Sequence, residues 1–590
     1  MLNSKTNRFL SITILDPKFR MRCLFVLVIL ASLLRIWLLI RANWMPLANS
    51  TFDDYLQVKQ AVSIVAGDWL GNGYDKFVMA KNPGFPLFLA GCYFLRIPYP
   101  FALGLLICAS AAYFCYSIRK LINYKWVLFV LYLIIIFTPF YQEAYLRIYR
   151  NALVPWVSLI VVSALINIYF SERSLKYNIL QALIGMGALG LFWILREDSI
   201  WIVPLVAFYV ILVAFKVLKS SEKKKMLLEK GIPIVIILLG VPLSVGIVSS
   251  INKAHYGIYA MNDRTETSIT SVMSDLYKID DGNRENDTDV WFSYASLQKA
   301  VESSPTLSAT GFKKDYENWA GEAGADVKGD LVGWALRDAM ANTGHYQDSL
   351  ETDELYQKIH NELQAAFDKG DLQAVDGISI SRYVKPMRSS DFSESFVLAF
   401  GALNALGHYN LCDSDYTKIN YMDGASEGDI EVWENILGIE IPKNEQQLQA
   451  VADRETVLWD NAIIERSMRR SAHITYIINR LYMVLSNILF PISMIVMVVL
   501  LAAALIRLFR RNKNQNDMWK IMFGFGLGGM ANLFAVSLFS RWISTDVYSS
   551  VWPFYASSIY LYITIFMTLA MVWLFDFLWR RFSKKRAESK

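Results

Sequence analysis

The sequence predicts a mainly helical, polytopic membrane protein with about ten transmembrane helices. A large, mostly helical domain is expected before the last three of them. Two observations predict this class. Hydrophobic residues make up 54% of the 590 residues and the mean hydropathy is +0.30, which is above the average of soluble proteins. Apolar runs long enough to cross a bilayer, about 20 residues each, recur along the chain and are interrupted by one long polar stretch, Ile251–Arg480.

The predicted spans follow from these apolar runs. The clear ones are Cys23–Ile40, Trp126–Pro139, Ala152–Phe170, Ile179–Ile194, Ile200–Val217, Ile232–Ile251, Leu481–Ile506, Met518–Phe539 and Trp552–Phe577. The region Pro83–Ile118 is apolar but is interrupted by "RIPYP". We expect it to form a half-buried helix, Phe85–Leu95, and then a single span from about Phe101, because one net crossing keeps the basic loops on one side.

Lys and Arg residues indicate the orientation, because they are enriched in cytoplasmic loops. Basic residues precede the first span, recur in every second loop and close the chain in "RRFSKKRAESK". Both termini are therefore expected in the cytoplasm, and residues 251–480 outside the plasma membrane. Because that stretch has a single Cys, Cys412, it can form no internal disulfide, which favours a bacterial cell surface. The first span lacks a small-residue cleavage site and is predicted to be an uncleaved anchor.

Charge separates the chain into three units: residues 1–250, residues 251–480 and residues 481–590. The middle unit has 21 Lys and Arg against 38 Asp and Glu, a net charge of −17, whereas the rest carries +22. The basic part is expected to lie against anionic lipid headgroups, and no nucleic-acid partner is implied. The five Cys show no metal-binding spacing.

The middle unit is expected to be helical with its own core. In "DELYQKIHNELQAAFDKG", Leu355, Ile359, Leu363 and Phe367 recur every four residues and form one apolar face. Gly370 follows as the predicted C-cap.

Charged residues gather where the chain leaves the membrane on the predicted outer side. The acidic ones include Asp53, Asp54, Glu143 and Glu197, and the basic ones include Lys81, Arg147, Arg150 and Arg196. Charge near a bilayer is costly and commonly marks a functional site. The alternative is that these residues are solvated, snorkel to the interface or pair locally. For Arg35, inside the first span, snorkelling explains the sequence as well as any function does.

These features, in this order, resemble the GT-C superfamily of membrane glycosyltransferases, in the branch of the protein O-mannosyltransferases and aminoarabinose transferases. The matching parts are the acidic pair Asp53–Asp54, the turn "KNPGFPLFLAG", the segment "EAYLRIYRNAL" and the turn "LREDS". The resemblance covers roughly Leu24–Leu212. The turn here is Asn-Pro-Gly-Phe-Pro and lacks the family's His, so no role of that His is carried over.

The resemblance implies transfer of a sugar from a polyprenyl-phosphate donor to an acceptor hydroxyl on a glycan, lipid or protein. Asp53 is then the general base, with Asp54 as its substitute or as the residue that orients it. The substrate and its phosphate would be bound by other residues of the cluster, namely Lys81, Glu143, Arg147, Arg150, Arg196 and Glu197. The sequence leaves open whether a divalent metal ion takes part, with Glu143 among its ligands. A transporter or flippase of lipid-linked sugars and a non-catalytic scaffold with a polymer-binding domain remain the alternatives.

Overall fold

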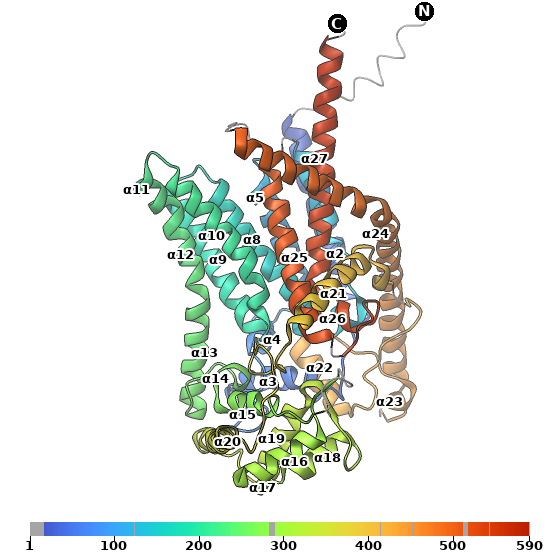
Figure 1. Cartoon of the computed structure of the whole chain (residues 1–590). Helices are drawn as coiled ribbons and strands as arrows, with labels where there is room; N and C mark the ends of the chain where they lie inside the picture. The colour runs from blue at the N-terminus through green and yellow to red at the C-terminus, as the bar shows by residue number, and fades with distance from the viewer. Residues whose placement is uncertain are drawn as a thin grey trace, which may run out of the picture.

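The structure is a computed structural model that describes residues 17–122, 124–282, 289–413, 415–450, 454–510, 517–541 and 543–588. Long helices form a bundle, and a smaller helical domain lies at one end of it (Figure 1). Helix α2 begins, and helix α27 ends, at the opposite end of the bundle. Some of the basic residues that indicate the orientation lie outside the described residues, namely Lys5 and Arg8 before the first span and Arg511 and Lys513 in the loop before Met518.

Nine helical stretches of the described residues are long and apolar enough to cross a membrane. Their helices are α2 (Pro17–Ile40), α5 (Tyr99–Ile118), α8 (Val154–Phe170), α9 (Leu175–Leu195), α10 (Val203–Leu218), the run α11–α13 (Lys223–Met226, Ile232–Leu238, Gly240–Tyr256), α24 (Arg454–Arg510), α25 (Met518–Ser540) and α27 (Ser558–Glu588). Large apolar side chains such as Phe25 and Val484 are exposed on these helices, as expected for surfaces that face lipid. The chain is therefore a multi-pass membrane protein.

The tenth predicted span, Trp126–Pro139, is shorter in the structure. Helix α6 (Lys125–Ile136) has 12 residues, a length of about 18 Å, which is less than the roughly 30 Å of a hydrocarbon core. The count of ten crossings thus stays a prediction. The expected half-helix is present as α4 (Gly84–Phe94), between α3 (Asp54–Ala66) and α5.

The domain at the end of the bundle, here called the polar domain, has a core of its own drawn from Ile269 to Met387. Its elements are α14 (Asp263–Glu266), α15 (Ser268–Leu276), β1 (Val290–Phe292), α16 (Tyr294–Ser303), α17 (Pro305–Ala309), α18 (Phe312–Ala320), β2 (Val327–Lys328), α19 (Val332–Asn342) and α20 (Ser349–Lys369). The strands pair antiparallel, Val290 with Lys328. Ile359 and Leu363 are fully buried and Gly370 ends α20 in the left-handed conformation, so the apolar face and the C-cap are confirmed.

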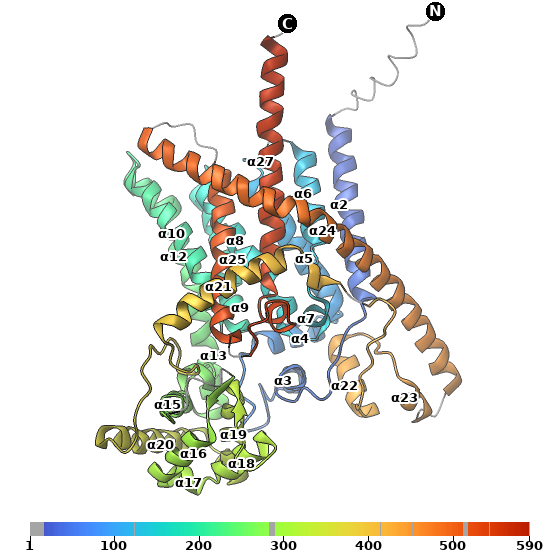
Figure 2. The same ribbon diagram turned by 45° about the vertical axis from the view of Figure 1, so that its right-hand side comes forward.

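Residues 389–450 pack against the membrane helices. This segment forms α21 (Ser389–Gly407), α22 (Glu427–Leu437) and α23 (Glu445–Ala450). Figure 2 shows α21 lying obliquely beside α25, where Phe396 stacks on Phe534 at 4.2 Å between ring centroids. Tyr409 is hydrogen-bonded to Thr564 of α27 at 2.6 Å. The stretch 251–480 is thus divided between two cores, that of the polar domain and that of the bundle.

Candidate functional site

Charged residues from four segments meet between the bundle and the polar domain. The segments are the start of α3, the turn before α4, the stretch from α7 (Gln142–Leu146) to the short helix Arg150–Ala152, and the link after α9. The turn before α4 is fixed from both sides. Asn82 donates its backbone N–H to Glu197 Oε1 at 2.9 Å and its Nδ2 to the carbonyl of Trp193 at 3.3 Å. From the polar-domain side, Asn262 donates to Asn82 Oδ1 at 2.6 Å.

Asp53 and Lys81 form the first pair of this cluster. Lys81 Nζ lies 2.6 Å from Asp53 Oδ1, and the Tyr149 hydroxyl donates to the same oxygen at 3.1 Å. The Lys81 side chain is 7% exposed, whereas that of Asp53 is 44% exposed although protein atoms surround its carboxylate closely. Burial opposes ionisation of Asp53, but Lys81, and then Arg150 and Arg147, outweigh it and hold its pKa well below the ordinary value. Asp53 is therefore an ionised carboxylate that solvent can reach.

Asp54 lies in a different environment from its neighbour. Its side chain is fully buried, and both oxygens accept from the Arg147 guanidinium, Nε to Oδ1 at 3.0 Å and Nη2 to Oδ2. The Ser50 hydroxyl donates to Oδ2 at 3.1 Å. Burial raises the pKa of Asp54 despite the Arg147 contacts. Both carboxylates lie at the N-terminus of α3, where the helix dipole stabilises negative charge. Asp54 thus anchors α3 to the segment after α7, and Asp53 is the accessible member of the pair.

Arg150 and Glu197 form a third pair beside the first. Arg150 Nη1 lies 2.8 Å from Glu197 Oε2, and both side chains are largely buried. Burial opposes ionisation of Glu197, but Arg150 and Lys81 hold its pKa well below the ordinary value. This pair supports the turn that carries Lys81, because Glu197 also accepts from Asn82.

Arg196 is bound by other protein groups. Its guanidinium donates to Asp198 through Nε at 2.7 Å and Nη2 at 2.5 Å, and to Asn151 Oδ1 through Nη1 at 3.1 Å. Nη1 also lies 3.3 Å from the carbonyl of Tyr555. These contacts join the end of α9 to the segments beside α8 and α27. The local pairing that the sequence offered as the alternative for Arg196 is present, and its role toward a phosphate stays a prediction.

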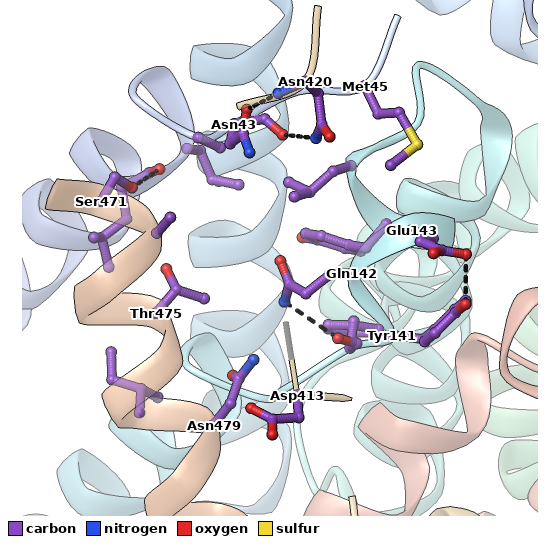
Figure 3. Close-up of a pocket in the computed structure, with 18 of the residues that line it drawn as sticks. Asn43, Met45, Tyr141, Gln142, Glu143, Asp413, Asn420, Ser471, Thr475 and Asn479 are labelled. Carbon is purple, nitrogen blue, oxygen red and sulfur yellow. Dashed lines mark hydrogen bonds between the residues drawn. The ribbon is translucent and has the colours of Figure 1, made fainter. Parts of the chain in front are cut away.

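Glu143 is directed elsewhere. It accepts from the Tyr141 hydroxyl at 2.5 Å and lines a cavity of about 340 Å³ between α2, α7 and α24 (Figure 3). None of Asp53, Asp54 and Lys81 lines this cavity. Within the described ranges, no group of three or more His, Cys, Asp or Glu side chains is arranged to hold a metal ion.

Several partners of the cluster were not found from the sequence. Tyr149, Asn82 and Asn262 carry no charge, and their contacts depend on chain segments that are far apart. Tyr149 lies between Arg147 and Arg150, both of which were predicted site residues. Its place in "RIYR" is the one signal in the sequence that could have predicted it.

The cluster combines an accessible carboxylate, a buried ammonium and a hydroxyl within hydrogen-bonding distance at the end of apolar helices. Such a set can accept a proton from a hydroxyl and can stabilise an anion beside it. No family model matches the chain, and a search of curated proteins finds no match.

Proposed function

We propose that the chain is a membrane glycosyltransferase that moves a sugar from a polyprenyl-phosphate donor to an acceptor hydroxyl. The observation that carries this proposal is the Asp53–Lys81 pair, an accessible carboxylate held beside a buried lysine where the bundle meets the polar domain. The resemblance of Asp53–Asp54 and of the turn at Lys81 to GT-C enzymes supports the same activity.

In this mechanism Asp53 is the general base. The acceptor O–H loses its proton to Asp53, the acceptor oxygen bonds to the anomeric carbon, and the bond from that carbon to the phosphate oxygen breaks. The polyprenyl phosphate leaves with the electron pair of that bond. Holding acceptor and donor at one place lowers the entropic part of the barrier.

Lys81 is the cation best suited to meet the departing phosphate. An ammonium has three donors, and among the described residues one hydrogen bond of Lys81 is found, to Asp53. The guanidinium of Arg147 is occupied by Asp54, and that of Arg150 by Glu197 and by the carbonyl of Leu195. When a phosphate draws Lys81 away, Asp53 loses its nearest cation, its pKa rises, and it becomes a stronger base. Arg147 then positions Asp53 through its neighbour Asp54, and the Arg150–Glu197 pair positions Lys81 through Asn82. Arg196 holds the end of α9 through Asp198 and Asn151.

The reaction is assigned to the outer face of the plasma membrane, with both termini in the cytoplasm. Single Cys residues introduced at Ser303 in α16 and at Ser583 in α27 test this in a Cys-free background. An impermeant maleimide added to intact cells is expected to label Ser303→Cys and to spare Ser583→Cys. Labelling of Ser583→Cys with protection of Ser303→Cys would reverse the orientation and remove the site from the outer face.

The activity itself is tested on the cell surface and with purified protein. Envelope glycans, lipids and proteins of a strain lacking the gene are expected to lose one sugar substituent, and extracts of that strain should supply the acceptor. Purified protein with a panel of polyprenyl-phosphate sugars should then release polyprenyl phosphate only when acceptor is present. A flippase would move the donor across vesicles without releasing polyprenyl phosphate, and a scaffold would do neither.

A further inference from the structure

The cavity between α2, α7 and α24 is separate from the Asp53–Lys81 pair. The segment after α2 pairs with the end of α7, where Met45 donates its N–H to the carbonyl of Leu146 at 3.0 Å. Met45, Tyr145 and Leu146 line the cavity, whereas the Arg147 side chain is bonded to Asp54 in the charged cluster. The segment around α7 therefore separates two sites. At about 340 Å³, the cavity is at the lower end of the size range of ligand pockets.

Arg35 is the charged residue at the wall of this cavity that lies within a span. It is 7% exposed, and its one hydrogen bond to a described residue is from Nη2 to the Tyr145 hydroxyl at 3.3 Å. Its Nε is buried without a partner, and no described carboxylate lies within ion-pair distance of it. A buried guanidinium without a counter-charge is costly. An anion bound in the cavity would remove this cost.

The other polar groups of the cavity fall into two sets. Asn43 and Asn420 are hydrogen-bonded to each other's backbone, and Ser471 donates to the carbonyl of Leu38 at 2.8 Å, so these residues hold the walls together. Thr475 makes no hydrogen bond through its hydroxyl within the described chain, and Gln142 uses Nε2 but not Oε1. Figure 3 shows Thr475 and Gln142 on facing sides of the cavity. These free groups suit a ligand that carries hydroxyls.

We propose that the cavity binds a phosphate ester of a polyol, with the phosphate on Arg35 and the polyol hydroxyls on Thr475 and Gln142. Arg35 lies five residues before the end of α2 at Ile40, about 7.5 Å along the helix, which is close to the level of lipid headgroups. Phosphate esters are the common anions there, and Arg binds them through two parallel hydrogen bonds.

Three acidic residues also line the cavity, and each of them is already engaged. Glu143 accepts from Tyr141, and Asp413 forms an ion pair with Arg480 at 2.8 Å. The exposed Asp415 accepts from the backbone N–H and the hydroxyl of Thr417 at 2.8 and 2.6 Å, and the exposed Lys418 adds a cation to the same lining. Arg480 therefore offsets the charge of Asp413, and hydroxyl or backbone donors satisfy Glu143 and Asp415, so none of the three pairs with Arg35. The proposal stands whether or not the chain transfers a sugar.

Binding to the full-length protein in detergent tests the proposal. sn-Glycerol 3-phosphate supplies the headgroup in free form and phosphatidylglycerol supplies it on a lipid, and glycerol and diacylglycerol are the controls without phosphate. Binding is followed by thermal stabilisation, and for the lipids also by native mass spectrometry. Saturable binding of the lipid alone would identify a lipid ligand, and binding of both phosphate esters would show that the headgroup suffices. Saturable binding of neither ester, or equal binding of the controls, would overturn the proposal.

Substitutions then locate the site. Arg35→Gln is expected to weaken binding roughly tenfold or more, the effect of a charge-assisted contact. Arg22→Gln, the same change at an exposed position of the same helix, is expected to leave binding unchanged. If Arg35→Gln does not fold, Thr475→Val decides, because it keeps the shape and removes one hydroxyl. We expect it to weaken binding a few-fold. Unchanged binding by a folded Arg35→Gln variant would contradict the proposed site. If that variant does not fold, unchanged binding by Thr475→Val would contradict it.

Discussion

Gly84, the first residue of α4, allows the turn that carries Lys81 to lie against the end of α9. A methyl group added at Gly84 would lie 2.5 Å from the carbonyl oxygen of Ile194 and 2.9 Å from the N of Leu195. Both are backbone atoms, so the methyl group can fit only if the turn moves away from α9. That movement stretches the hydrogen bonds from Asn82 to Glu197 and to the carbonyl of Trp193. Gly84→Ala is therefore expected to destabilise the protein and to displace Lys81.

The expected loss of stability is about 2–4 kcal/mol, from overpacking and from two weakened hydrogen bonds. Gly91→Ala is the matched control, because it lies in the same helix with nothing within 4 Å of an added methyl group. Alanine there should be neutral or slightly stabilising. Thermal unfolding of both variants in one detergent makes the comparison. Unfolding of Gly84→Ala at the temperature of Gly91→Ala would refute the close contact between the turn and α9.

Two further predictions concern the charged residues. Arg196→Lys is expected to lower the unfolding temperature and to leave polyprenyl-phosphate binding unchanged, because Asp198 and Asn151 occupy the guanidinium. Weaker binding at an unchanged unfolding temperature would instead support a phosphate-binding role for Arg196. Lys81→Met is expected to move the acid limb of the pH–rate profile to higher pH, because Lys81 holds the pKa of Asp53 below its ordinary value of about 3.9. The depressed pKa means that the pair adds stability above the unfolded-state pKa and loses it as pH falls through the folded-state pKa. If the acid limb lies at the same pH in Lys81→Met and in wild type, Asp53 is not the group whose ionisation sets it.

Much of the membrane bundle could be predicted from the sequence, because a span needs a long apolar run whatever its neighbours are. The half-helix α4 was predicted because "RIPYP" interrupts the apolar region and because one net crossing keeps the basic loops on one side. The division of residues 251–480 could not be predicted in the same way. Helix α21 carries Asp391, Glu394 and Asn404 among its apolar residues, so its sequence resembles a surface helix. One face of this helix, with Ala399, Ala402 and Leu406, is buried, and this burial depends on partners in α25 and α27 that are more than 100 residues away.

The candidate site was predicted as a set of residues but not as a set of contacts. Asp53 and Asp54 are adjacent in sequence, yet one is accessible and the other fully buried. Which of them meets Lys81 or Arg147 depends on how the turn before α4 and the segment after α7 approach α3. Glu143 was grouped with Arg147 because they are close in sequence, but α7 directs Glu143 toward the cavity instead. Short-range sequence spacing cannot resolve such choices when the backbone turns within a few residues.

The rate of sugar transfer by Asp53→Asn, compared with wild type, tests the central claim most directly. The change is nearly isosteric and removes the proton acceptor, and the accessible position of Asp53 lets the variant keep its fold. We predict a rate about 10²–10⁴-fold lower. The unfolding temperature should fall only modestly, because Lys81 loses its counter-charge but keeps a hydrogen-bond acceptor in the new amide oxygen. Asp54→Asn provides the contrast, since it breaks a buried pair with Arg147. Its main effect should be a lower unfolding temperature. Full activity of a stable Asp53→Asn protein would contradict the account.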